Sequence, residues 1–508
     1  MDTRTASPIG RRALLGAGVA LLLLVLHGLL FRFVIDDAFI SFRYARNLVA
    51  GEGLVFNPGE RVEGYSNLLY VLLSAAGLKL GCDPLLWGRI WSTAAAGALL
   101  ALLPGAVRAL APDAGPRGEA AGRLAQFLVA ATGAVACWML GGLETVFFAA
   151  FAVAAWRGAL ARDAVAAAVA GVLLVLTRPE GPGLAVLFLA WALLPGAGAH
   201  AAAPRRRSWA GPAILLGGLA AFLLWRHQYF GLWLPNTYYA KTGDLPGQLR
   251  TGWPYAVGFL LFYGLPLAAA AAVALRQGAG AVLRRRDVGL SFAVAGVWLV
   301  YATVVGGDSL GMYRFLVPVL PVLTTTVAAL FTVSPWLARR GPAAILTAVL
   351  VVALLPASFA GRERRLVDLH RGEANLGGWI LAGDAMAAQL PPGSTIALGP
   401  AGYIPWATGF RTWDFYGIIE PHIAHQRVTF EFGYAGHEKH DGAYIVSQRP
   451  DYILIGNVDI TDRPRTQLIP PHRREVDIVT DKRFQAEYEQ IHLPVAGGKY
   501  LNLFRRKP

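Results

Sequence analysis

Residues 11–49 read RRALLGAGVALLLLVLHGLLFRFVIDDAFISFRYARNLV, an apolar stretch that ends at two adjacent aspartates, Asp36 and Asp37. The apolar part, 13–31, matches the ~20 residues that a helix needs to cross a bilayer. A signal peptide also begins after a basic pair, but this apolar run is too long and lacks a small-residue cleavage site. We therefore predict an uncleaved first membrane span that is followed by two carboxylates, Asp36 and Asp37.

The composition extends this pattern to most of the chain. Of the 508 residues, 55% are hydrophobic and 15% are charged, and the mean hydropathy is +0.46, as is typical of a multi-pass membrane protein. The formal net charge of +14 lies mostly in short loops, where lysine and arginine set membrane orientation, so it does not indicate nucleic-acid binding. The two cysteines have no metal-ligand spacing, and no Walker or dinucleotide-binding pattern is present in the sequence.

Twelve apolar stretches are candidate spans. If all twelve crossed, the basic run Arg205 to Arg207 would lie opposite Arg11 and Arg12, against the positive-inside rule. The shortest candidate, 66–80, would be ~22 Å long as a helix, which falls short of a ~30 Å hydrocarbon core. We therefore predict about 11 transmembrane helices and assign 66–80 to a re-entrant or juxtamembrane helix. The candidates are 12–34, 66–80, 86–110, 123–139, 143–158, 162–177, 181–197, 208–228, 254–275, 288–306, 313–334 and 341–358.

With this topology every motif-like loop falls on the extracytoplasmic face, including the loops 35–65 and 229–253 and the polar tail. The tail contains short β-like runs at 395–398 and 452–455, Gly/Pro turns and a helical pattern near 373–389. The fold class is therefore a polytopic α-helical membrane domain at 1–360, followed by an extracytoplasmic α/β domain at 361–508. The tail is long enough to form its own core.

The first outer loop begins with a predicted amphipathic helix that lies on the membrane. Its apolar stripe is Phe39, Phe42, Ala45, Leu48 and Val49, whereas Arg43, Arg46 and Asn47 lie off the stripe. The aspartates at its start have two interpretations. One of them caps the helix, or the pair is catalytic: two close carboxylates repel, and desolvation near lipid also raises a carboxyl pKa, so one can act as a base for a hydroxyl. The pair could also bind Mg²⁺ or Ca²⁺ or act without either, and the sequence leaves this open.

Several blocks along the chain carry a family resemblance. They are 36–47 (DDAFISFRYARN), 53–65 (GLVFNPGERVEGY), 142–144 (GLE), 177–181 (TRPEG), 234–241 (LPNTYYAK), 306–308 (GGD), 314–318 (RFLVP), 436–439 (GHEK) and 441–442 (DG). On these blocks the chain closely resembles the GT-C glycosyltransferases, and within them the AftB-like branch that includes terminal arabinofuranosyltransferases of cell-wall arabinan. The resemblance spans both the membrane part and the tail.

The resemblance implies an enzyme that takes a sugar from a polyprenyl-phosphate carrier and transfers it to a hydroxyl of a glycan or glycolipid outside the cytoplasmic membrane. The family has juxtamembrane helices in its first outer loop and an essential aspartate after its first span. That role falls on Asp36 or Asp37, and the sequence does not separate them. Sugar identity, linkage, stereochemical outcome and oligomeric state are also left open.

A lipid-linked phosphate donor needs cationic groups at headgroup level. Lys241, Arg314 and Arg178 are the candidates. Each also has a structural interpretation, because Arg178 can pair with Glu180, Arg314 with Asp308, and Lys241 can extend along the interface. The candidates for sugar or acceptor binding are Glu63, Glu144, Tyr65, Asn236, Asp308 and His437.

Other residues and functions remain as alternatives. The tail histidines and acids near 413–441 have no zinc-ligand spacing, so a solvated charged loop is favoured over a metal site. A separate role in guiding acceptor glycan over Trp, Tyr and His surfaces stays open. His27, within the first span, is interpreted as a packed or hydrogen-bonded residue. Two other classes of function stay open: a transporter or flippase for a polyprenyl-linked lipid, and a noncatalytic envelope-assembly protein.

Overall fold

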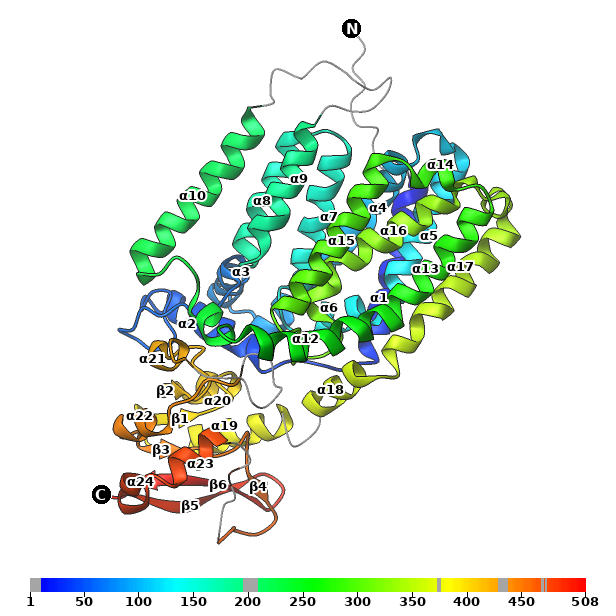
Figure 1. Ribbon diagram of the computed structural model, residues 1–508. Helices are drawn as coiled ribbons and strands as arrows, with labels where there is room; N and C mark the ends of the chain where they lie inside the picture. Colours follow the sequence, from blue (N-terminus) through cyan, green and yellow to red (C-terminus); the bar gives the residue numbers. More distant parts are fainter. Residues whose placement is uncertain (1–10, 195–208, 372–375, 428–436, 467–469, 471–472) are drawn as a thin grey trace. The chain divides into compact units, whose positions relative to one another are not determined.

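The computed structural model describes the chain except for residues 1–10, 195–208, 372–375, 428–436, 467–469 and 471–472. The basic run Arg205 to Arg207, residues 373–375 of the predicted tail helix and Gly436 of the GHEK block lie outside the described residues. The chain divides into two compact units (Figure 1). One unit comprises Met1–Arg32, Arg89–Leu224 and Gly252–Leu366, and the other comprises Phe33–Gly88, Trp225–Thr251 and Val367–Pro508.

The membrane part is helical, and its helices coincide with the predicted apolar stretches. Within the described residues, seven helical segments are long and apolar enough to cross a membrane. The seven segments are α1 (Arg11–Leu29), α4 (Pro84–Leu110), α10 (Ala210–Phe230), Leu245–Arg276, α15 (Arg286–Val304), Arg314–Val333 and Arg340–Ser358. The chain is therefore a multi-pass membrane protein.

Three of these segments are composite. They are α12 (Leu245–Phe259) with the π-helical turn η2 (Leu260–Gly264) and α13 (Leu265–Arg276); η3 (Arg314–Val319) with α16 (Leu320–Leu330) and η4 (Phe331–Val333); and α17 (Arg340–Leu354) with η6 (Leu355–Ser358). The short helices η1 (Pro112–Ala114), α14 (Gly280–Leu283) and η5 (Pro335–Ala338) lie between spans.

The predicted span 123–139 is instead a broken helix. Its halves, α5 (Pro116–Ala131) and α6 (Gly133–Leu140), meet at an angle of 63°. The break redirects one helical hydrogen bond: the N–H of Ala134 donates to the Tyr263 hydroxyl (3.1 Å), and the Ala130 carbonyl lies 2.9 Å from Nδ1 of His27. Because a carbonyl only accepts, His27 is the Nδ1–H tautomer, and its Nε2 accepts from Ser358 Oγ at 2.8 Å. His27 is thus a hydrogen-bonded residue that satisfies backbone at membrane depth, as such a break requires.

Four apolar helices are shorter than the seven. These are α3 (Leu68–Lys79), α7 (Thr145–Leu160), α8 (Ala164–Thr177) and α9 (Gly181–Leu193). With 12 residues, α3 is ~18 Å long, too short to cross a ~30 Å core unaided. This length agrees with a re-entrant or juxtamembrane assignment for 66–80, whereas the total of eleven crossings stays a prediction.

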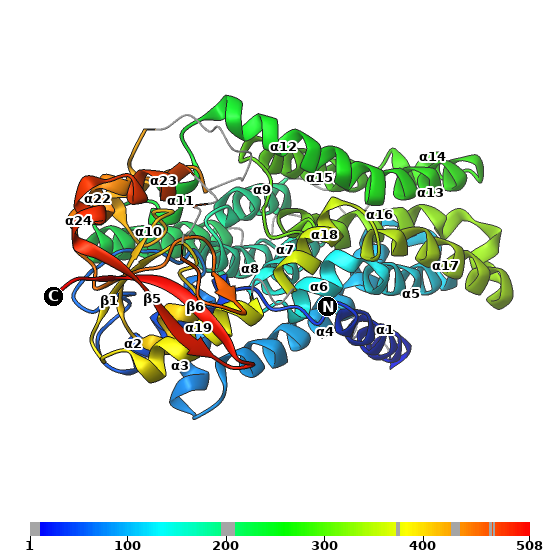
Figure 2. The same ribbon diagram turned by 90° about the horizontal axis from the view of Figure 1, so that it is seen from below.

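The tail is an α/β structure around a six-stranded mixed sheet. Its strand order is β2-β1-β3-β6-β4, with β5 also paired to β6. The strands are β1 (Thr395–Leu398), β2 (Arg411–Asp414), β3 (Tyr452–Ile453), β4 (Ile460–Thr461), β5 (Tyr488–Val495) and β6 (Lys499–Arg506). β1 runs parallel to β2 and β3, whereas β6 runs antiparallel to β3, β4 and β5. Figure 2 shows the long β5–β6 hairpin in red.

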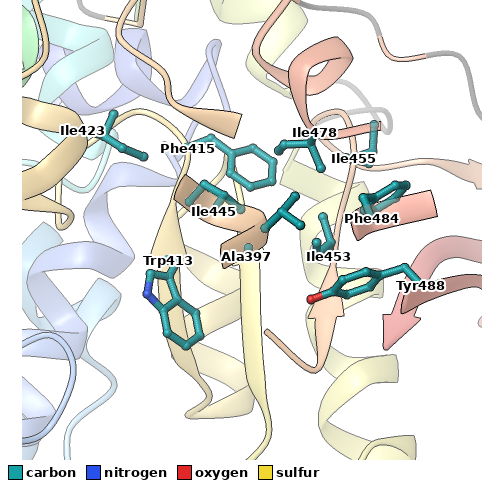
Figure 3. Packing of buried hydrophobic residues seen from close by; sticks show 11 residues of the cluster. Ala397, Trp413, Phe415, Ile423, Ile445, Ile453, Ile455, Ile478, Phe484 and Tyr488 are labelled. Carbon is teal, nitrogen blue, oxygen red and sulfur yellow. The ribbon is translucent and has the colours of Figure 1, made fainter. Parts of the chain in front are cut away.

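The tail helices cover a dry core. They are α19 (Gly378–Gln389), α20 (Tyr403–Thr408), α21 (Pro421–Ala424), α22 (Gly442–Ser447), α23 (Arg473–Val479) and α24 (Lys482–Glu487). Figure 3 shows Ile453 in a buried cluster with Phe415, Ile445 and Phe484. The predicted strand at 395–398 is present as β1, the run at 452–455 is a strand at Tyr452–Ile453, and the helical pattern near 373–389 is a helix at Gly378–Gln389.

The compact unit that contains the tail also includes parts of two outer loops. The first loop provides α2 (Asp37–Val49) and α3, and the second provides α11 (Asn236–Lys241). The helix α18 (Arg362–Arg371) leads from the last span toward the tail. The unit therefore differs from a division at 360/361, because loop residues predicted to belong with the membrane part pack with the tail.

Candidate functional site

Asp36 connects the first outer loop to the tail. It is only 5% exposed, and both of its carboxylate oxygens accept backbone N–H groups at the start of α20: Oδ2 from Gly402 (2.9 Å) and Oδ1 from Tyr403 (2.8 Å). Its side chain makes no capping bond to its own helix α2. The capping interpretation was therefore wrong about which helix is capped, because the carboxylate caps a helix 366 residues further along the chain.

The polar face of α2 binds the other end of α20. Arg43 is 1% exposed and donates to the carbonyls of Pro405 (2.6 Å) and Phe410 (2.7 Å), while Arg46 donates to the Trp406 carbonyl (2.6 Å). Spacings of seven and three residues place Asp36, Arg43 and Arg46 on one side of the helix. The polar face expected off the membrane stripe is therefore buried against protein, and so are Phe39, Phe42 and Ala45 of the stripe itself.

Asp37 differs from its neighbour in both exposure and contacts. It is the first residue of α2 and is half-buried. Within the described part of the chain, no hydrogen bond or ion pair to its carboxylate is present, although its charge acts on Asp36. The structure thus separates two residues that the sequence could not: Asp36 is committed to backbone donors, and Asp37 has a carboxylate available for another group.

A second polar group in this unit surrounds Glu63. This carboxylate is 2% exposed and accepts from Nη2 of Arg226 at 3.2 Å; Nε of Arg226 lies 2.8 Å from Oε2 without hydrogen-bond geometry. The Glu63 carbonyl accepts from the N–H of Asn236, whose side chain donates to the carbonyls of Gly417 and Ile418. Tyr65 is also buried; burial and, to a smaller extent, the nearby charge of Glu63 raise the pKa of its hydroxyl.

Three buried oxygens in this group lack hydrogen-bond partners among the described residues. They are Oε2 of Glu63, the hydroxyl of Tyr65 and Oδ1 of Asn236. A buried polar atom without a partner costs ~1–3 kcal/mol, so such atoms are expected to receive a ligand or water. The structure therefore brings three of the sequence-selected binding residues together.

Lys241 and His437 lie near the contact between α11 and the tail. Lys241 is half-buried in the last turn of α11. The preceding Tyr239 stacks on His425 at 4.6 Å, and its carbonyl accepts from the ammonium group of Lys439 at 2.6 Å. His437 packs edge-on against Tyr416, at 4.6 Å between ring centroids. The GHEK block therefore holds the second outer loop to the tail through its lysine.

The remaining predicted residues gather in the membrane-helix unit. Arg178 donates to Glu144 (2.7 Å) and Glu180, and Arg314 donates to both carboxylate oxygens of Asp308, at 2.8 and 3.1 Å. Both arginines are less than 10% exposed. Their guanidinium groups lie 5.3 and 5.2 Å from the centre of the Phe315 ring, so the two ion-pair groups are neighbours.

The positive charges of Arg178 and Arg314 are already balanced by neighbouring carboxylates. Two arginines face three carboxylates, which leaves one net negative charge if all are ionised. Each guanidinium has five N–H donors, and among the described residues no hydrogen bond is made by Nη2 of Arg178 or Nη1 of Arg314. The structural pairings considered from the sequence are present, and one terminal nitrogen of each arginine is left for another acceptor.

Acids and histidines of the tail make hydrogen bonds and ion pairs with other tail residues. Asp414 is fully buried and accepts from the N–H groups of Tyr416, Ile418 and Ile419, so it does not lie in a solvated loop as predicted. His422 pairs with Asp441 at 2.9 Å. Within the described ranges, no group of three or more His, Cys, Asp or Glu residues is arranged to hold a metal ion. Each carboxylate oxygen of Asp36 already accepts one backbone N–H group.

The buried acids predict how stability depends on pH. Burial raises the pKa of Asp36, Glu63 and Asp414 to about 7, against the opposing effect of their hydrogen bonds or of Arg226. A raised folded-state pKa means that the folded chain holds protons that the unfolded chain releases. The contribution of these three acids to the stability of the folded chain is therefore complete below about pH 4. It is lost as the pH rises toward about 7. We expect the melting temperature of the detergent-solubilised protein to fall between pH 5 and pH 8; a rise would contradict these shifts.

The helices and the C-terminal sheet define a class of protein: a multi-pass membrane protein with a strand-containing C-terminal region. The crystal structure of ArnT from Cupriavidus metallidurans bound to undecaprenyl phosphate is similar, with a TM-score of 0.56 at 13% identity over 82% of this chain and 88% of that one. The cryo-EM structure of the mycobacterial arabinofuranosyltransferase AftD has a TM-score of 0.52 at 16% identity, over 98% of this chain and 40% of that one. These likenesses confirm the coarser part of the predicted fold class, a mostly helical membrane protein that resembles GT-C enzymes in fold and has a strand-containing C-terminal region.

Sequence comparison is more specific. The chain is 29% identical over 274 residues to the terminal β-(1→2)-arabinofuranosyltransferase of Mycobacterium tuberculosis, which covers 46% of this chain and 40% of the relative. It is 27% identical over 356 residues to the enzyme of that name from Corynebacterium glutamicum, which covers 58% and 47%. The chain thus spans less than half the length of these relatives. A family model described as a domain of unknown function, DUF8728, matches residues 368–504.

Some site residues were not selected from the sequence. Arg226, the partner of Glu63, is the one Asp, Glu, Lys or Arg residue of α10, and a charge in an apolar helix is itself a signal. Arg43 and Arg46 were noted only as polar positions on α2. Gly402 carried no signal, because its contact with Asp36 depends on a separation of 366 residues.

Proposed function

We propose that the chain is a membrane glycosyltransferase that moves a sugar from a polyprenyl-phosphate donor to a hydroxyl of a cell-envelope glycan or glycolipid. The observation that carries the proposal is the half-buried Asp37 carboxylate, which has no partner among the described residues and follows the first span beside an anchored Asp36. The similarity to two terminal arabinofuranosyltransferases supports this reaction class and makes arabinofuranose the first sugar to test.

In the proposed reaction Asp37 takes the proton of the acceptor hydroxyl. The acceptor oxygen then forms a bond to the anomeric carbon of the donor, and the bond from that carbon to the phosphate oxygen breaks. Polyprenyl phosphate leaves with the electron pair, and Asp37 returns its proton to solvent. A positioned base of this kind contributes ~10²–10⁴-fold to a rate.

Cations near the donor phosphate stabilise the departing charge. We propose Lys241, Arg314 and Arg178 for this contact, and the two arginines also pair with carboxylates. The two arginines would contact the phosphate through their terminal nitrogens. Glu63, Tyr65 and Asn236 are proposed to bind sugar or acceptor hydroxyls through the oxygens that lack partners, with Glu144, Asp308 and His437 as weaker candidates.

We further propose that the protein lies in the cytoplasmic membrane with about 11 crossings and with the active site and residues 361–508 facing outward. The basic residues of the shorter loops support this orientation.

The test uses purified protein in lipid vesicles with a panel of labelled polyprenyl-phosphate sugars and extracted envelope glycans. We expect label to appear in the glycan from one donor class, which identifies the sugar. A second readout, movement of a labelled polyprenyl lipid between leaflets, separates the transporter alternative. Lipid movement without glycan labelling would favour a flippase, and neither signal would favour a noncatalytic assembly protein.

A further inference from the structure

We propose that the short tail helix α20 is a positioning element of the active site: it fixes Asp36 and thereby holds the adjacent Asp37 in place for proton abstraction. This inference rests on the proposed function and assigns positioning roles to Gly402, Tyr403 and Arg46, which lie outside the predicted site. In this view the tail belongs to the catalytic machinery rather than forming a separate glycan-binding module.

The first step is the fixation of Asp36. Its side chain accepts two N–H groups from α20, and its own carbonyl accepts from the N–H of Phe39 at 2.9 Å. Side chain and backbone are therefore both restrained at the residue directly before Asp37. Because consecutive Cα atoms are a fixed distance apart across a trans peptide, restraint of Asp36 restricts where Asp37 can lie.

The second step is the close fit at Gly402. A Cβ atom built there would lie 2.1 Å from the carbonyl oxygen of Asp36 and 2.4 Å from its Cγ and Oδ2. Any side chain at 402 would displace the aspartate or the helix. The glycine is thus required by the approach of two segments rather than by a turn.

The third step is the rigidity of α20 itself. The helix forms the crossover between the parallel strands β1 and β2, so the tail sheet holds both of its ends. Its carbonyls at Pro405 and Trp406 accept from Arg43 and Arg46 of α2. Because α20 is held by the sheet and hydrogen-bonded to α2, its N–H groups keep a fixed position. The carboxylate of Asp36, which accepts from them, is therefore fixed as well.

A matched pair of variants isolates one hydrogen bond of this clamp. Tyr403→Pro and Tyr403→Ala both remove the ring and hydroxyl, but only Tyr403→Pro removes the N–H that donates to Asp36. Residue 403 is the first residue of α20, a position that proline tolerates well. Each variant is measured in lipid vesicles for kcat, donor KM and amide hydrogen exchange of 37–49 and 403–408.

The expected result is that Tyr403→Pro lowers kcat by about 10- to 100-fold relative to Tyr403→Ala, as for a misplaced reacting group. Donor KM should stay within about threefold, because the substitution touches positioning rather than uniform binding. Amide hydrogen exchange of residues 37–49 and 403–408 should become faster in Tyr403→Pro but not in Tyr403→Ala. Equal kcat in the two variants would overturn the proposal.

A second variant covers the case in which Tyr403→Pro does not fold. Arg46→Gln removes a half-buried donor to Trp406 and is expected to lower kcat with donor KM unchanged; an unchanged kcat would overturn the proposal. Failure of the proposed function looks different, because the wild-type protein would then transfer no sugar from any donor. Faster exchange in the proline variant would still support the clamp in that case, and unchanged exchange would overturn it.

Discussion

Asp37→Asn is expected to lower the rate of sugar transfer by a factor of about a thousand while leaving the protein folded. Asparagine has nearly the same shape but cannot accept the hydroxyl proton at neutral pH. Because the Asp37 carboxylate has no hydrogen-bonding partner among the described residues, its replacement should change the unfolding free energy by no more than about 0.5 kcal/mol. The measurement is turnover of the purified variant in lipid, with its melting temperature.

Asp36→Asn is the matched control. Its side chain would keep one accepting oxygen but would direct an amide NH₂ group toward a backbone N–H. We expect a loss of ~1–3 kcal/mol in stability, as for a hydrogen bond to a charged group, with a smaller fall in turnover than for Asp37→Asn. If Asp36→Asn abolishes sugar transfer and Asp37→Asn stays active, the base is Asp36 and not Asp37.

Arg178→Met is expected to destabilise the membrane-helix unit by ~3–5 kcal/mol, because it leaves Glu144 and Glu180 as buried charges without their cation. Methionine keeps much of the apolar volume of the arginine stem, so the loss reports charge rather than packing. The measurement is thermal or denaturant unfolding in detergent. Arg505→Met serves as the control, since the Arg505–Glu489 pair is exposed and its loss should leave the melting temperature nearly unchanged.

A combined variant tests the physical reason for that loss. Replacing Arg178 by Met together with Glu144→Met and Glu180→Met removes all three charges at once and leaves apolar side chains of similar volume. A buried ion pair replaced as a whole is often close to neutral, so most of the stability should return. If the combined variant is as unstable as Arg178→Met alone, the arginine acts mainly through packing against Phe315 and not through its charge.

The membrane helices could be predicted because each is a long apolar run whose composition alone reports burial in lipid. The break at Thr132 and Gly133 could not, since both halves are apolar and the groups that repair it, His27 and Tyr263, come from distant spans. Contacts of this kind carry no periodic signal. The broken span was therefore predicted as one continuous helix.

The candidate site was predicted in part. Asp36, Asp37 and Glu63 could be selected because charged residues beside apolar spans are costly and tend to be functional. The environment of Asp36 depends on tail residues such as Tyr403, 367 positions away, and that of Glu63 on Arg226, 163 positions away. Helical spacing correctly placed Arg43 and Arg46 on one face of α2, but no local pattern indicates that a tail helix covers that face.

The most direct test of the central claim measures release of polyprenyl phosphate by the purified wild-type protein in vesicles, with and without an acceptor glycan. A transferase should release many equivalents per protein, one for each sugar transferred, and only when acceptor is present. Release that equals the protein-free background for every donor, with the wild-type protein folded, would contradict the assignment of this chain as a glycosyltransferase.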